Sequence, residues 1–417
     1  MLKYFIILIT VLSFTVTKAQ APQSIKLSDV VQRVSQSNYK VYENALKVYQ
    51  AKANIEKARA DLLPRLNIWS IASIILDPLS IADRITDIAP FLVPANWFRI
   101  EENKLLYLAE KEGYRALWGN EVNVAKTIYK HVLYDQELYK QITLSIVELE
   151  KIHKIVKTRE TFGGAKPGTA RDIEIRILGL KEDSENLKVL LNLEYDELTY
   201  ALGFPADVEL TFGAVEMPVI EKLQTINPKD YEFRVLSISP ERRQFDHFFS
   251  VLNQIKKEID YAIMGVSSIS RGVAGGVFDS IPIPNGLGGR EASLKILEAQ
   301  REIMKTQKLG VEETLKRQLR AVAVQYNSDL TNYDNFKRRA VLAKESKDSI
   351  INRLKLGEDI DVIELSESSR NQILAETALM TVHYRVLNAT DRMQRLMFEG
   401  DYSMNPPLID SLKGKGK

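Results

Sequence analysis

Apolar residues recur every three or four positions along two very long stretches of the chain. From Val122, the first series continues at Ala125, Tyr129, Val132, Tyr139, Ile142, Ile146, Leu149, Ile152 and Val156. The second series comprises Val311, Leu315, Leu319, Val322, Tyr326, Leu330, Tyr333, Phe336 and Ala340. One narrow apolar stripe on an otherwise charged helix is typical of a coiled-coil seam rather than of a broad core face. The pattern predicts two long helices that each pack along one side.

These helices are predicted to be unusually long. Neither proline nor another clear helix break interrupts residues 97–162 or 290–356. At 1.5 Å per residue each helix would extend about 100 Å, and most of such a helix would protrude from a globular domain. We therefore expect the helices to pack side by side into a rod or tube.

Each long helix ends at a turn that contains glycine. The first turn is FGGAKPG, residues 162–168, followed by Thr169 and Asp172 in the spacing of a capping box. The second is LKLGEDID, residues 354–361, where Gly357 is expected to stop the helix and acidic residues to favour the next N-terminus. The helix after the first turn carries its own stripe at Ile173, Ile177, Leu180, Leu187, Leu191, Tyr195, Leu198 and Leu202. Each half of the chain is thus predicted to be a helical hairpin.

The two halves also resemble each other in sequence. Residues 27–68 align without a gap on residues 228–269, and residues 168–175 align on 357–364. Two matches in the same order predict an internal duplication. The predicted organisation is a signal peptide (1–19), repeat 1 (20–203, with a membrane-proximal segment at 65–96), a linker (204–227), repeat 2 (228–400, with a β segment at 259–289) and a flexible tail (401–417).

Composition narrows the compartment and the kind of partner. Lys3 followed by the apolar run 4–16 and by Thr17-Lys18-Ala19 predicts an export signal. The chain has no cysteine, which excludes disulfides, thiolate metal sites and a cysteine nucleophile. Its 57 Lys and Arg residues are interleaved with 55 Asp and Glu residues, so the basic stripe expected of a nucleic-acid binder is missing.

No motif in the sequence predicts catalysis, a cofactor or a metal. No two of the histidines (His131, His153, His247 and His383) have the i, i+4 spacing of a zinc helix. GLGGRE at 286–291 and GGAKPGT at 163–169 lack the residue order of nucleotide-binding loops, so both are expected to be turns. The seam tyrosines are expected to pack. Trp69 and Trp97 have two interpretations, an interfacial aromatic girdle or ordinary packing.

The whole arrangement resembles the TolC-like outer-membrane efflux protein (OEP) family. The resemblance is carried by residues 27–66 with their LLP junction, the turn 353–369 and LEYDELTYALGF at 193–204. It implies a fold that is mainly α with a small β part: coiled-coil-like hairpins in a trimeric α-barrel, and a short outer-membrane β-barrel. It further implies a homotrimer in the outer membrane, with most of its mass in the periplasm and with a periplasmic adaptor and an inner-membrane pump as partners.

The segment after Pro64 departs from the family pattern. Residues 67–76 alternate poorly between apolar and polar, and Asp77-Pro78 is typical of a helix start. The first hairpin of the barrel is therefore predicted to be shortened or remodelled. This leaves two functions open: a passive export channel of a tripartite efflux or type I secretion system, or a structural relative with a degenerate barrel and no open pore.

The resemblance also assigns candidate site residues. Acidic residues after the second turn line the periplasmic constriction of the family, and the matching positions here are Asp361 and Glu364, with Asp172 as the counterpart in the first half. The alternative is a helix-dipole partner for Asp361 and a solvated face for Glu364. The residues expected to contact an adaptor are those of the two turns: Gly163, Gly164, Gly168, Leu356, Gly357 and Glu358.

Overall fold

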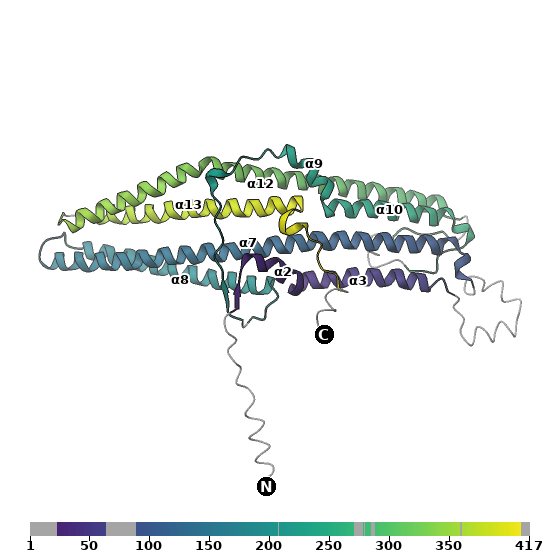
Figure 1. Cartoon of the computed structure of the whole chain (residues 1–417), viewed down its shortest axis with the longest axis horizontal. Coiled ribbons are helices and arrows are strands. Elements are labelled where there is room, and N and C mark those ends of the chain that lie inside the picture. The colour runs from purple at the N-terminus through teal and green to yellow at the C-terminus, as the bar shows by residue number, and fades with distance from the viewer. Residues whose placement is uncertain are drawn as a thin grey trace, which may run out of the picture. The chain divides into compact units, whose positions relative to one another are not determined.

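The computed structural model of the chain describes residues 23–63, 89–206, 208–270, 278, 280–284, 288–358 and 361–409. Within these ranges the protein is almost entirely helical (Figure 1). The chain divides into two compact units. Unit 1 comprises Met1–Arg33, Ala125–Met217 and Arg339–Met380, and unit 2 comprises Val34–Val124, Pro218–Arg338 and Thr381–Lys417.

Two helices are far longer than the others, as the apolar series predicted. They are α7 (Pro94–Thr161, 68 residues) and α12 (Arg290–Lys355, 66 residues). Each continues through a short turn into a second helix, α8 (Thr169–Ala201) or α13 (Val362–Met397). Shorter α-helices within the described ranges include α2 (Leu27–Ser37), α3 (Tyr39–Ala60), α9 (Lys229–Ile238) and α10 (Pro240–Asp260). Short 3-10 helices are η1 (Pro90–Leu92), η2 (Ile220–Lys222), η3 (Ala262–Met264) and η4 (Gly400–Ser403).

A buried polar residue separates each pair of shorter helices. Asn38 lies between α2 and α3, and its side chain accepts a hydrogen bond from the backbone N–H of Val41 at 3.0 Å. Ser239 lies between α9 and α10, and its hydroxyl accepts from the N–H of Arg242 at 3.2 Å. A side chain that binds a free N–H of the first turn fixes where a helix begins. Both pairs therefore begin their second helix at a defined cap.

Unit 1 contains a small parallel sheet. β1 (Gln23–Ile25) pairs with β2 (Leu210–Phe212) in the register Gln23–Leu210 to Ile25–Phe212. The buried Tyr129 hydroxyl lies 3.0 Å from the carbonyl oxygen of Ile25 and 2.7 Å from that of Gly213. Its ring packs edge-on against Phe212 at 5.3 Å. The seam tyrosine thus packs, as expected, and anchors the sheet to α7.

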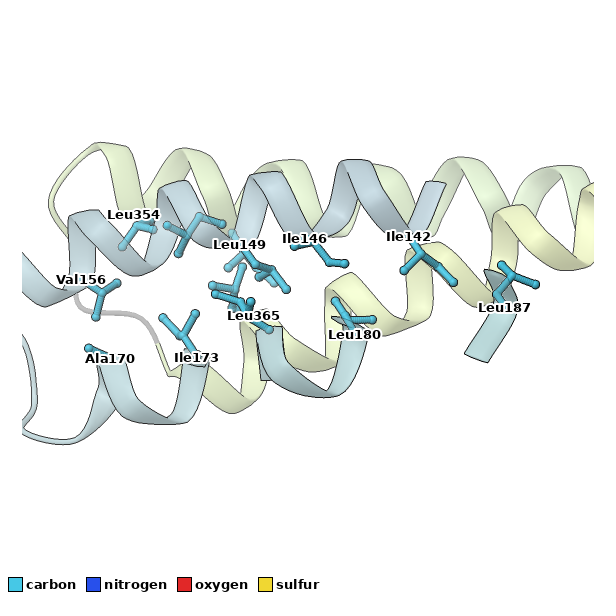
Figure 2. Close-up of a cluster of buried hydrophobic side chains, with 13 residues drawn as sticks. Ile142, Ile146, Leu149, Val156, Ala170, Ile173, Leu180, Leu187, Leu354 and Leu365 are labelled. Atoms are coloured by element: carbon cyan, nitrogen blue, oxygen red, sulfur yellow. The ribbon is translucent and has the colours of Figure 1, made fainter. Parts of the chain in front are cut away.

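The hydrophobic core of unit 1 lies directly behind the two turns (Figure 2). It is built from the seams of α7 and α8, with Leu354 from the end of α12 and Leu365 from the start of α13. Figure 2 shows these side chains pointing toward one another from all four helices. The core contains Ile142, Ile146, Leu149, Ile152, Val156, Ala170, Ile173, Ile177, Leu180, Leu187, Ile350, Leu354 and Leu365. Apolar burial therefore holds both turns in place from behind.

Unit 2 has a separate core between α7, α10 and α12. Its fully buried residues include Leu106, Val251, Ile255 and Phe278. Trp118 is also buried; its indole N–H donates to the Ser35 hydroxyl at 2.8 Å and its ring packs against Tyr402.

The end of the described chain differs from the sequence prediction. Residues 401–409, expected to belong to a flexible tail, instead pack into unit 2, where Tyr402 and Ile409 are buried. The Tyr114 hydroxyl donates to the carbonyl oxygen of Pro407 at 2.8 Å, which fixes this segment to α7. Pro406 and Pro407 exclude a helix here, but the segment still packs against unit 2. The rest of the predicted tail lies outside the described residues.

Two other predicted segments are described only in part. The signal peptide lies outside the described ranges. So do residues 65–88, which include Trp69 and most of the predicted first hairpin of the barrel, and residues 271–277. Residues 90–92 form η1 and α7 begins at Pro94, so the last part of the predicted membrane-proximal segment is helical. Where the structure describes the predicted β segment 259–289, the end of α10, η3, a helical residue at position 278 and irregular chain stand in place of strands.

Trp97 is described and is half exposed, with its indole N–H donating to the carbonyl oxygen of Phe91 at 2.8 Å. A role in an aromatic girdle stays a prediction. Across the described ranges, no helix combines the length and the apolar character of a membrane span.

Candidate functional site

The first turn of the candidate site follows α7. Phe162 is 84% exposed, and the chain reverses through Gly163, whose φ is +72°. The N–H of Gly164 donates to the carbonyl oxygen of Arg159 at 2.8 Å, which satisfies one of the free carbonyls at the helix end. Gly168, with φ of +94°, precedes the first residue of α8. Positive φ at both positions explains why glycine occurs there.

The predicted capping box at this turn is wrong. The N-cap of α8 is Gly168, which has no side chain, and Thr169 is already the first helical residue. The Thr169 hydroxyl instead donates to the carbonyl oxygen of Lys166 at 2.7 Å. Asp172 therefore lies in the first turn, where a negative charge is favourable next to free N–H groups. Its exposed carboxylate is 4.0 Å from Nε of Arg171.

The second turn is shorter and follows α12. Gly357 has φ of +95°, as expected of the residue that stops a helix. The N–H of Gly357 donates to the carbonyl oxygen of Leu354 at 3.1 Å, and that of Glu358 donates to Arg353 at 3.2 Å. Leu356 is 82% exposed. Each turn thus presents one large apolar side chain, Phe162 or Leu356, to solvent.

Arg353 links the acidic residues on either side of the second turn. Its Nε donates to Glu358 Oε2 at 2.8 Å, and Nη1 donates to Glu364 Oε1 at 3.2 Å. The hydrogen bond to Glu358 and the charge of Glu364 raise the pKa of Arg353 above its ordinary value. One guanidinium therefore joins the end of α12 to the first turn of α13.

A second arginine joins the two turns to each other. Nη1 of Arg159, near the end of α7, donates to the carbonyl oxygen of Glu358 at 3.1 Å. Arg159 Nη2 also lies 3.4 Å from the position that a Cβ would occupy at Gly357. Glycine at 357 thus serves twice: it adopts the positive φ and leaves room for the arginine. Two hairpin ends distant in sequence meet at this contact.

The predicted gate residues occupy different environments. Asp361 is exposed, and its carbonyl oxygen accepts from the N–H of Leu365 at the start of α13. Glu364 is exposed and paired with Arg353. Asp172 belongs to the other turn beside Arg171. The gate role of these acidic residues stays a prediction. Sequence reasoning missed both Arg159 and Arg353, because an arginine on a charged helix gives no sign of its partners.

No metal centre forms in the part of the chain that the structure describes. Groups of three or more His, Asp or Glu side chains suited to hold an ion do not occur there. The chemistry available at the turns consists of exposed apolar contacts, hydrogen bonds from arginine and carboxylate charge.

Comparison with known proteins gives matches among solved structures. No family model and no curated protein matches the chain. A membrane protein from Pseudomonas aeruginosa superposes with a TM-score of 0.70 at 15% identity, over 90% of this chain and 91% of that one. The Campylobacter jejuni CmeC outer membrane channel superposes with a TM-score of 0.71 at 12% identity, over 94% of this chain and 89% of that one. The open state of the Neisseria gonorrhoeae MtrE outer membrane channel superposes with a TM-score of 0.65 at 13% identity, over 89% of this chain and 88% of that one.

This chain has the TolC-like outer-membrane efflux protein fold. The TolC-like fold accounts for the order of two long helices, each followed by a returning helix, that the sequence predicted. At identities of 12–15% the likeness concerns the course of the backbone. The roles of side chains at the two turns come from this chain's own contacts.

Proposed function

We propose that this chain is one protomer of an outer-membrane channel, a passive conduit for export. The observation that carries the proposal is a TolC-like fold shared over about nine-tenths of both chains with proteins described as outer membrane channels. The protomer would be located in the outer membrane with most of its mass in the periplasm. It would connect to a periplasmic adaptor and an inner-membrane pump, without a catalytic role or cofactor of its own.

A homotrimer would cover apolar side chains that one protomer leaves exposed. On α3, Tyr39, Tyr42, Leu46 and Tyr49 follow steps of three and four and are 41–54% exposed. A second apolar stripe of this kind is typical of a helix with partners on two sides. Replacing Tyr42 and Leu46 with Glu should yield monomers by light scattering. Lys47→Glu, which lies on the same helix outside the stripe, should leave the trimer intact; a wild-type monomer would contradict the assembly.

Asp361 and Glu364 are proposed to form the charged entrance of the channel. Three protomers would bring about six carboxylates into one ring, which attracts cations. Arg353 already offsets part of the charge of Glu364. In planar bilayers, Asp361→Asn with Glu364→Gln should weaken block by multivalent cations, and Arg353→Gln should strengthen it. Asp172→Asn tests the third gate candidate, at the other turn, and equal block in all variants and the wild type would contradict the proposal.

The two turns are proposed to contact the adaptor. Phe162 and Leu356 are the most exposed apolar side chains there, at 84% and 82%, and a few residues near the centre of an interface carry most of its binding energy. Leu356→Asp should reduce co-purification of the adaptor by at least about tenfold. Leu374→Asp, at an exposed leucine further along α13, should not reduce it. Equal loss in both variants would indicate a general defect instead.

A structural role without an open pore is the second candidate. It is favoured by the helical turn at residues 90–92 and the helix that begins at Pro94, at the end of the predicted membrane-proximal segment. Conductance measurements on the purified trimer in planar bilayers separate the two functions. A channel should conduct once the turns are loosened by Arg159→Ala and Arg353→Ala. A trimer that inserts but never conducts would support the structural role.

A further inference from the structure

A cavity of about 530 Å³ opens in unit 2 where α13 ends and α10 begins. Glu241 contributes from the first turn of α10, and Arg392, Arg395 and Leu396 contribute from the last turns of α13. α7 and α12 supply the other walls. The volume lies within the range of about 300–1,000 Å³ that is usual for small-molecule sites.

One wall of the cavity is a fixed ion pair. Arg395 is buried and donates to Glu241 Oε1 at 2.5 Å, to Asn120 Oδ1 at 3.1 Å and to the carbonyl oxygen of Ala116 at 3.2 Å. Burial alone would raise the pKa of Glu241, but the charge and hydrogen bonds of Arg395 outweigh it and hold that pKa below its ordinary value. Glu241 Oε2 accepts from the Ser239 hydroxyl at 2.8 Å. This wall is neutral overall and internally satisfied.

The rest of the lining combines an apolar floor with free donors. Leu315, Val322 and Leu396 are buried beneath the opening. Arg392 and Gln318 are exposed at its edge and have no hydrogen-bond or ion partner among the described residues. Since Arg395 and Glu241 offset each other, Arg392 leaves one positive charge over an apolar surface.

We propose that this cavity binds a small amphipathic organic anion, with its carboxylate on Arg392 and Gln318 and its aliphatic part on Leu315, Val322 and Leu396. A guanidinium binds a carboxylate through parallel N–H donors, which is a stronger contact than neutral hydrogen bonds provide. An uncharged aliphatic molecule would gain only the apolar contacts, and a short anion would gain only the charge. The site therefore selects molecules that have both, independently of the export function proposed above.

The test uses octanoate that carries a photoreactive diazirine on its chain, with the full-length protein in lipid nanodiscs. Labelled residues are mapped by mass spectrometry and competed with unlabelled octanoate. Saturable labelling should fall on 311–322 and 392–396, the segments that line the cavity. Arg392→Gln should weaken the binding of octanoate by about tenfold, which corresponds to the loss of one charge-assisted hydrogen bond. The neutral amide of octanoate should bind the wild type about tenfold more weakly than octanoate does. Arg392→Gln should bind the amide and octanoate with equal affinity.

Two further variants separate the cavity from general binding to apolar surface. Ala321→Trp places an indole at an exposed lining position and should abolish saturable labelling while the circular dichroism spectrum stays unchanged. Arg301→Gln removes a charge from an exposed arginine of α12 outside the lining and should leave affinity unchanged. Labelling that does not saturate, or that survives Ala321→Trp, would overturn the proposal. Equal binding of octanoate and its amide to the wild type would overturn the role of Arg392.

Discussion

The guanidinium of Arg159 donates a hydrogen bond of 3.1 Å to the carbonyl oxygen of Glu358, and so joins the turn after α7 to the turn after α12. Arg353 Nε holds the side chain of the same glutamate at 2.8 Å. Glu358 is therefore bound through its backbone by one hairpin and through its carboxylate by the other. The two hairpin ends are thus joined at this residue as well as through the apolar core behind them.

Arg159→Ala should loosen the second turn. Loss of one partly exposed hydrogen bond corresponds to about 1 kcal/mol, or roughly fivefold faster opening. Hydrogen exchange of peptides covering 353–358 should accelerate by that factor, while exchange in the middle of α12 stays unchanged. Arg171→Ala is the control, since Arg171 lies at the other turn, where its Nε is 4.0 Å from Asp172. Equal acceleration in both variants would argue against a link between the turns.

Gly357→Ala should destabilise the same turn for two reasons. The residue has φ of +95°, and its Cβ would lie 3.4 Å from Arg159 Nη2. Forcing an L-residue into the left-handed region costs about 1–2 kcal/mol. Limited proteolysis should then cleave near residue 357 several times faster than in the wild type.

Gly179→Ala is the matched control for that substitution. Gly179 lies inside α8 and has nothing within 4 Å of an added Cβ. Alanine there should stabilise the helix by about 0.5–1 kcal/mol, because it reduces the freedom of the unfolded chain. The two alanine variants should thus shift the unfolding temperature in opposite directions. A shift of the same sign in both would show that the backbone of the second turn is not strained by a side chain.

The sequence predicted the long helices because their period extends over many turns. Val122 to Val156 and Val311 to Ala340 contain enough repeats to establish the apolar stripe, and Gly357 marks a helix end without help from tertiary contacts. The predicted cap at Thr169 was wrong because the residue before it is a left-handed glycine, which moves the helix start by one position. A capping motif in the sequence therefore predicts the first residue of a helix only when the conformation of the neighbouring residue allows it.

Contacts between residues far apart could not be predicted in this way. The three-residue strands β1 and β2 are too short to show a pattern, and their pairing depends on Tyr129. Arg159 and Glu358 meet only because two hairpins end side by side. The internal duplication stays a prediction. It is supported by Asn38 and Ser239, which the alignment of 27–68 with 228–269 pairs and which both cap a helix from the same position.

The ion pair of buried Arg395 with partly buried Glu241 predicts a strong effect of removing one partner. The side chains are 7% and 24% exposed, and Glu241→Gln would leave the arginine charge without its counterion. An unpaired buried charge costs about 3–5 kcal/mol. The temperature of unfolding, followed by circular dichroism at 222 nm, should fall clearly. Glu43→Gln removes an exposed partner of Lys47 and should leave that temperature unchanged. A small loss in both variants would mean that water reaches Arg395.

A pair of carboxyl groups between α7 and α8 predicts how stability depends on pH. Burial raises the pKa of Glu194 from 4.5 to about 7, and the charge of Asp135 and a shared hydrogen bond with that residue add to the shift. Burial also raises the pKa of Asp135, against the hydrogen bond from Glu194 and the charge of His131. The folded protein therefore holds a proton that the unfolded chain has already released at neutral pH.

Stability should consequently fall as pH rises from about 4.5 to about 7, and then level off, since a group with a raised pKa favours the folded state only while it is protonated. Glu194→Gln cannot ionise, so its unfolding temperature should change less than that of the wild type between pH 5 and pH 8. Glu150→Gln is the control of opposite sign, because the hydrogen bond and charge of Lys181 lower the pKa of Glu150. That variant should keep the decline seen in the wild type. If Glu194→Gln showed the full decline as well, another titratable group would cause the loss of stability. The contact between Asp135 and Glu194 would then not govern the pH dependence of this fold.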